Sequence, residues 1–182
     1  MNYDEAVAWL YASQLHGIKL GLENTQRLIE ALGVRLDGDT APKFLHVAGT
    51  NGKGSVCALL DACCRAGGLR SGLFTSPHLV TFRERIQVDG KMISEAEVAA
   101  GLTTIRDLVA GWDHAPTFFE ITTALALVWF QQQGAEVVAL ETGMGGRLDA
   151  TNVVTPAVSV LTPIGLDHQQ YLGDSLAAIA VE

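Results

Sequence analysis

Apolar residues recur at helical spacing in the first forty positions. One such pattern covers residues 7–15 and ends at Gly17, and a second covers residues 28–32 and ends at Gly33. Residues three or four positions apart share one face of a helix, and glycine often ends such an element. The chain therefore opens with two predicted helices.

After Pro42 the pattern changes to short apolar runs. Residues 44–47 predict a buried strand, which leads through a glycine-rich turn into a predicted helix over residues 55–66. Leu73 and Phe74 form a second short run. Residues 85–93 alternate around Asp89-Gly90, which indicates a hairpin.

The second half repeats the alternation of helix and strand. Ser94 with Glu97 forms a capping box, which predicts a helix to about Val109, and a further apolar helix is expected to end at Gly134. Predicted strands follow over residues 137–140 and 158–161. We expect an α/β fold with a mostly parallel sheet covered by helices on both faces. Ligands bind such sheets beyond the carboxyl ends of the strands.

Composition narrows the class of protein. A chain of 182 residues fits a single domain, and its formal net charge of −8 with no cluster of Lys or Arg argues against nucleic acid as a partner. No apolar run approaches the roughly 20 residues of a membrane span. Asp4 and Glu5 are unlike the start of a signal peptide. We expect a cytoplasmic protein in which Cys57, Cys63 and Cys64 are reduced core thiols.

Polar residues collect directly after the predicted strands. They are Thr50–Ser55, Thr75 with Ser76, Glu141, and Asp167 with His168. Parallel strands end at the same edge of a sheet, so these four groups are expected to meet in one place.

The segment Gly49-Thr50-Asn51-Gly52-Lys53-Gly54-Ser55 predicts a phosphate-binding loop. Its glycines free the backbone to turn N–H groups toward phosphate oxygens, the following helix presents its positive end, and Lys53 can neutralise the outer phosphates. The usual spacing has glycine where Val47 stands, and Gly54 separates Lys53 from Ser55, so this is a variant. The alternative is a glycine turn that only starts a helix.

Other polar residues are ambiguous on their own. Glu141 at a strand end suits a carboxylate that holds Mg²⁺, although such residues often only cap or face solvent; Gly143 beside it favours a site. His168 alone favours a structural role, because magnesium prefers oxygen ligands. Arg83 and Arg85 are expected to be solvated, and the three tryptophans are assigned to packing.

Taken together, these residues resemble the folylpolyglutamate synthase and dihydrofolate synthase family, within the larger group of Mur-type amide ligases. The resemblance covers nearly the whole chain. The segments that carry it are Val47–Ser55, Thr75–Leu79, Glu84–Ile86, Glu141–Asn152 and Leu166–His168.

The resemblance implies roles for individual residues. Thr50, Asn51, Gly52, Lys53, Gly54 and Ser55 would hold the phosphates of ATP, with Lys53 also stabilising the transferred phosphoryl group. Ser76, Glu141 and His168 would ligate Mg²⁺, which reverses the isolated interpretation of His168. The pterin-bearing substrate would contact Ile18, Lys19, Leu20, Thr117, Phe119, Leu148, Asp149 and Ala150.

The implied reaction is ATP-dependent addition of L-glutamate to dihydropteroate or reduced folates through an acyl phosphate, a step of folate and one-carbon metabolism. By comparison with the family, the chain looks like a truncated amino-terminal ATP-binding domain without the carboxy-terminal, glutamate-binding domain. We expect it to bind Mg-ATP without ligating.

Two alternatives stay open. One is the corresponding domain of a cell-wall Mur ligase, although those ligases usually carry Thr directly after the loop lysine. The other is a stand-alone nucleotide-binding module. A GTPase would need a guanine-recognition segment of the type Asn/Thr-Lys-x-Asp, and this sequence has none.

Overall fold

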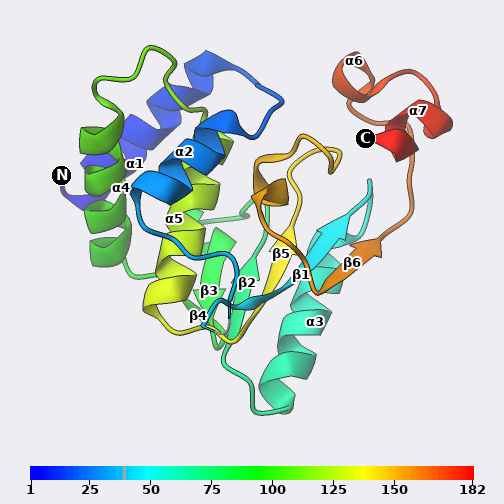
Figure 1. Cartoon of the computed structure of the whole chain (residues 1–182), viewed down its shortest axis with the longest axis horizontal. Coiled ribbons are helices and arrows are strands. Elements are labelled where there is room, and N and C mark those ends of the chain that lie inside the picture. The colour runs from blue at the N-terminus through cyan, green and yellow to red at the C-terminus, as the bar shows by residue number, and fades with distance from the viewer. Residues whose placement is uncertain (39) are drawn as a thin grey trace.

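The computed structural model describes residues 1–38 and 40–182 and is built around one mixed sheet (Figure 1). Within those residues the sheet has six strands in the order β4-β3-β2-β5-β1-β6. β2, β5, β1 and β6 run parallel, and β3 and β4 add an antiparallel hairpin at one edge. The strands are β1 (Lys43–Ala48), β2 (Ser71–Phe74), β3 (Ile86–Val88), β4 (Lys91–Met92), β5 (Val137–Glu141) and β6 (Val158–Leu161).

The first five α-helices lie at the predicted positions within a few residues, whereas the last two were not predicted. The α-helices are α1 (Tyr3–Ala12), α2 (Glu23–Ala31), α3 (Lys53–Ala66), α4 (Glu95–Val109), α5 (Phe118–Gln132), α6 (Gln169–Leu172) and α7 (Leu176–Val181). Short 3₁₀ turns are η1 (Ser13–His16), η2 (Phe82–Arg85) and η3 (Ala150–Val153). The α/β class and the predicted hairpin are confirmed.

Local capping signals explain where several helices begin. The predicted box at α4 is present, since the Ser94 side chain accepts from the Glu97 N–H and Glu97 accepts from the Ser94 N–H. Thr117 and Glu120 form the same reciprocal pair at the start of α5. Each box satisfies two backbone donors that the first helical turn leaves unpaired.

The two faces of the sheet carry different layers (Figure 1). α5 lies against one face, with α1, α2 and α4 packed around it, and this side holds the larger apolar core. α3 covers the other face over a small cluster formed by Val47, Cys57, Leu73 and Ala139. Helices therefore cover both faces, as the alternation of elements predicted.

The structure corrects one prediction about the core. All three lie on α3: Cys57 is buried against the sheet, but Cys63 is exposed and Cys64 is half-buried. The reason is that α3 turns only one side toward the sheet, so neighbouring residues on the helix face different surroundings. The tryptophans do pack: Trp129 is buried, and Trp9 and Trp112 lie against the core.

Within residues 1–38 and 40–182, no helix combines the length and the apolar character that a membrane crossing requires.

Gly72 in β2 provides a test of the packing between the sheet and α5. A Cβ at this position would lie 2.9 Å from the Phe130 ring and 3.0 Å from a Val138 methyl group, both on fully buried side chains. We expect Gly72→Ala to lower the free energy of unfolding by about 1–3 kcal/mol through overpacking. The control is Gly111→Ala, where a Cβ would meet open space. Equal urea midpoints for the two variants would contradict this packing.

Candidate functional site

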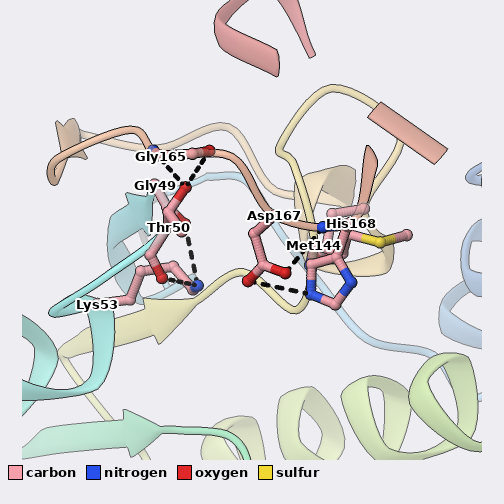
Figure 2. A network of polar contacts seen from close by, with 8 residues as sticks. Gly49, Thr50, Lys53, Met144, Gly165, Asp167 and His168 are labelled. Atoms are coloured by element: carbon pink, nitrogen blue, oxygen red, sulfur yellow. Dashed lines mark hydrogen bonds and ion pairs between the residues drawn. The ribbon is translucent and has the colours of Figure 1, made fainter. Parts of the chain in front are cut away.

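The loop after β1 needs glycine at two positions. Gly49 has φ +128° and a Cβ there would lie 2.2 Å from Thr162 Oγ1, while Gly52 has φ +88° and precedes α3 directly. Both values lie where side chains are strained. The loop is also fastened to the segment after β6, because Thr50 Oγ1 accepts a hydrogen bond from the Gly165 N–H at 2.9 Å (Figure 2).

Lys53 is the first residue of α3, and its ammonium folds back over the loop. Its Nζ donates to the carbonyl oxygens of Gly49 at 2.9 Å and Thr50 at 3.3 Å (Figure 2). The cation is therefore held beside the backbone N–H groups at the start of α3. A positive side chain and a helix N-terminus at one place favour an anion.

A first cavity of about 280 Å³ opens beside this loop. Thr50 and Lys53 line it, together with the glycine stretch at residues 143–147 and with His168. The other predicted phosphate-loop residues, Asn51, Gly52, Gly54 and Ser55, lie in the loop and the first turn of α3 without lining the cavity.

Glu141 ends β5 and is buried, with 4% of its surface exposed. Its Oε2 accepts the Ser76 N–H at 2.7 Å, and the Gly54 N–H also donates to the carboxylate. Burial raises the pKa of Glu141, while the bond from Ser76 and the charge of Lys53 oppose that shift. The loops after β1 and β2 thus meet on this carboxylate.

His168 lies in the segment beyond β6, with a left-handed backbone. Its Nε2 lies 3.8 Å from Asp167 Oδ2 (Figure 2), and the residue lines both this cavity and the next. Among the described residues, no three His, Cys, Asp or Glu side chains are grouped to hold a metal ion. The predicted magnesium set differs from such a group because it includes the hydroxyl of Ser76.

A second cavity of about 540 Å³ lies between the helical layer and the same edge of the sheet. The residues that the resemblance assigned to substrate all line it: Ile18, Lys19, Leu20, Thr117, Phe119, Leu148, Asp149 and Ala150. Gly143, Met144 and His168 line both cavities. The two cavities therefore share a wall.

Arg85 is the functional candidate that sequence reasoning missed. It was expected to be solvated, but only 8% of its surface is exposed and it lines the second cavity. Its Nε donates to His78 Nδ1 at 2.8 Å, and its guanidinium carbon lies 5.3 Å from the Phe118 ring centroid. Burial lowers the pKa of Arg85, whereas the charge of Glu141 raises it. Arg83, which was likewise expected to be solvated, is half-buried and donates a hydrogen bond to the Ile93 carbonyl.

Asp149 organises the wall between the cavities. Its Oδ2 accepts from the backbone N–H groups of Gly143 and Met144 at 2.9 and 2.8 Å, and its Oδ1 accepts from the Thr151 N–H and hydroxyl at 3.0 and 2.5 Å. Because the Thr151 hydroxyl donates to Asp149, it must accept from His46 Nε2, 2.8 Å away. The Asp-x-Thr spacing is a local signal for such a turn.

The model of the Mur ligase middle domain matches residues 47–181. Dihydrofolate synthase/folylpolyglutamate synthase of Bacillus subtilis is 40% identical over 185 residues, which cover 99% of this chain and 42% of that protein.

Solved structures give the same picture. A complex described as FPGS-AMPPCP-folate is 38% identical with a TM-score of 0.86, covering 98% of this chain and 44% of that one. Escherichia coli FolC in complex with DHPP and ADP is 40% identical with a TM-score of 0.84, covering 96% of this chain and 42% of that one. The chain thus spans less than half the length of these relatives.

The buried His46 predicts a pH dependence of stability. Burial lowers the pKa of His46 from 6.5 to about 4. Between these two pH values the unfolded chain therefore binds a proton at His46, whereas the folded chain does not. The stabilisation is fully present above pH 6.5 and is lost as the pH falls toward 4, at most about 3 kcal/mol. His46→Gln keeps an N–H donor for Thr151 but does not titrate. We expect its unfolding free energy, from urea titrations, to fall less steeply over this window; parallel curves would contradict the assignment.

Proposed function

Because the chain belongs to the Mur ligase middle domain family, we propose that it is the ATP-binding part of a ligase that joins L-glutamate to dihydropteroate or reduced folates. The observation that carries the proposal is the shared wall formed by Gly143, Met144 and His168. Through this wall, the first cavity, which lies beside the phosphate-type loop, adjoins the second cavity, which is apolar and lined by the buried Arg85. The relatives described as complexes with AMPPCP, folate, DHPP and ADP support this pairing of ligands.

We propose the first cavity as the nucleotide site. The loop from Thr50 to Ser55 and the start of α3 supply backbone N–H groups for the phosphates, and Lys53 supplies the positive charge. Its present partners are two neutral carbonyl oxygens, which an anionic phosphate can replace at little cost.

We propose that Ser76, Glu141 and His168 hold Mg²⁺ beside the phosphates. The buried carboxylate of Glu141 fits a hard cation, since Lys53 approaches it without forming an ion pair within 4 Å among the described residues. When bound, the ion neutralises charge on the transferred phosphoryl group. The bond from the Ser76 N–H to Glu141 fixes the carboxylate in one orientation.

We propose the second cavity as the site of the pterin-bearing substrate. Phe118, Phe119 and Leu148 offer apolar walls for a flat ring system. At the edge near Glu141, the guanidinium of Arg85 is suited to the substrate carboxylate because arginine presents several donors in one plane.

The proposed reaction forms an acyl phosphate and then an amide. The substrate carboxylate attacks the γ-phosphate of ATP and releases ADP, and the amino group of glutamate then displaces phosphate from the acyl carbon. Lys53 and the loop N–H groups stabilise the charge that develops on the phosphoryl oxygens, and Arg85 aligns the attacking carboxylate. No covalent intermediate with the protein is needed.

We treat residues 1–182 as one ATP-binding domain that acts in the cytoplasm. We propose that ligation requires this domain together with parts of the longer relatives outside the aligned 42%, which would recognise glutamate. A cell-wall Mur ligase or a stand-alone nucleotide module is the competing function. The second cavity, with every residue assigned to the pterin substrate in its lining, favours the folate ligase.

Lys53→Ala tests the nucleotide site. Losing a charge-assisted contact is worth about 1.5–3 kcal/mol, so we expect Mg-ATP affinity to fall roughly 10- to 150-fold in calorimetric titrations. Lys91→Ala is the control, because it removes the same charge from an exposed strand at the far edge of the sheet. Competition with GTP in the same titration distinguishes an ATP site from a guanine-specific module. Equal affinity for the wild type and Lys53→Ala would rule out this role.

Glu141→Gln tests the metal site. The amide keeps the size of the side chain but removes its charge, so we expect ATP affinity to drop about 10-fold or more with Mg²⁺ and to change much less in EDTA. Titrations under both conditions measure the difference. An equal loss with and without Mg²⁺ would show that Glu141 only supports the loops after β1 and β2.

A further inference from the structure

His78 lies in the segment between β2 and η2 and joins two residues from different layers. Its Nδ1 accepts the Arg85 Nε–H at 2.8 Å, and its Nε2 lies 3.2 Å from the Tyr11 hydroxyl on α1. The ring also meets Phe82 edge-on, with 6.4 Å between centroids. Tyr11 in turn stacks on Phe118 with 5.5 Å between ring centroids.

The direction of these hydrogen bonds is determined by the donors. A guanidinium can only donate, so Nδ1 of His78 must present a lone pair to Arg85. A neutral imidazole then carries its proton on Nε2 and donates it to the Tyr11 oxygen. One directed series therefore runs from Arg85 through His78 to Tyr11 and ties the arginine to the helical layer.

This arrangement leaves the outer part of the guanidinium available. Among the described residues, the terminal amino groups of Arg85 make no hydrogen bond or ion pair, and the only donor in use is Nε. Arg85 lines the second cavity and lies close enough to Glu141 for each charge to affect the other's pKa. Without the bond to His78, the arginine is free to turn toward Glu141 and pair with it.

We propose that His78 is a positioning residue which, supported by Tyr11, holds the free edge of Arg85 toward the second cavity and thereby selects ligands that carry a carboxylate. The inference rests on the proposed function, because it assumes that a pterin-bearing carboxylate occupies this cavity. His78 acts through its hydrogen-bond acceptor and touches neither the nucleotide nor the reacting atoms.

Two substitutions of His78 test the roles of its two imidazole nitrogens separately. His78→Asn places an amide oxygen near the position of Nδ1 and can still accept from Arg85. His78→Gln reaches toward the position of Nε2, near Tyr11, but leaves the Arg85 Nε–H without its acceptor. Tyr11→Phe removes the acceptor for Nε2 and keeps the aromatic stack on Phe118.

The experiment measures the affinities of each protein for dihydropteroate and for its primary carboxamide, which differ only in the carboxylate. We expect the wild type to prefer dihydropteroate, and His78→Gln to lose roughly 10-fold of that preference, the lower end for a charge-assisted contact. His78→Asn retains the preference within about 3-fold, and Tyr11→Phe falls between the two. Affinity for the carboxamide stays nearly constant throughout.

Other outcomes overturn the inference. An unchanged preference in His78→Gln, or an equal loss in His78→Asn, would show that the acceptor at Nδ1 does not matter. Equal weakening of both ligands, together with a lower melting temperature, would assign His78 a purely structural role; Tyr11→Phe gives the same comparison if His78→Gln does not fold. A wild type that binds neither ligand would overturn the proposed function itself, whereas binding with unchanged preference would overturn only this inference.

Discussion

The arrangement of the site depends on the hydrogen bonds that the buried carboxylate of Glu141 accepts. β5 lies between β1 and β2, and the register pairs Glu141 with Val47. The side chain therefore emerges between the two loops that follow those neighbouring strands. Burying a carboxylate is costly unless hydrogen bonds compensate, and here the Ser76 and Gly54 N–H groups both donate to it. The same bonds that offset the cost hold the loops around the site.

Most of the fold could be predicted because its signals are local. The capping box at Ser94 and the glycines that end helices act within one turn, and short apolar runs mark the strands. The order of the strands was beyond such signals, because β5 enters between β1 and β2 only when α5 and α3 pack on opposite faces. Cys63 shows the same limit: a helix turned with one side to the sheet exposes residues that composition assigns to the core.

The candidate site was predictable where the sequence carries a motif. The glycines around Lys53 and the strand-end position of Glu141 predicted where the loops after β1, β2 and β5 meet, and the resemblance named residues that all line the second cavity. Arg85 escaped because its burial needs Phe118, more than thirty positions away, and the lone pair of His78. Arginine side chains are exposed in most proteins, but a specific hydrogen-bond acceptor in the folded chain can hold one in a buried position.

The wall between the cavities explains why glycine stands at position 143, two residues after Glu141. A Cβ on Gly143 would lie 2.6 Å from the Phe119 ring and 3.1 Å from Asp149 Oδ2, so a larger residue would push the wall into the second cavity. Both carboxylate oxygens of Asp149 accept hydrogen bonds from backbone N–H groups, and one also accepts from the Thr151 hydroxyl, so these bonds hold the wall in place. Gly143 and Met144 line both cavities, so this stretch of backbone forms part of the wall between them. In the proposed reaction the attacking carboxylate and the γ-phosphate must approach to about 3–3.5 Å, so the two ligands have to meet past the edge of this wall while each stays held in its own cavity. The hydrogen bonds to Asp149 keep the wall in place, and glycine at position 143 keeps it from crowding the second cavity, so both features leave room for the two ligands to meet.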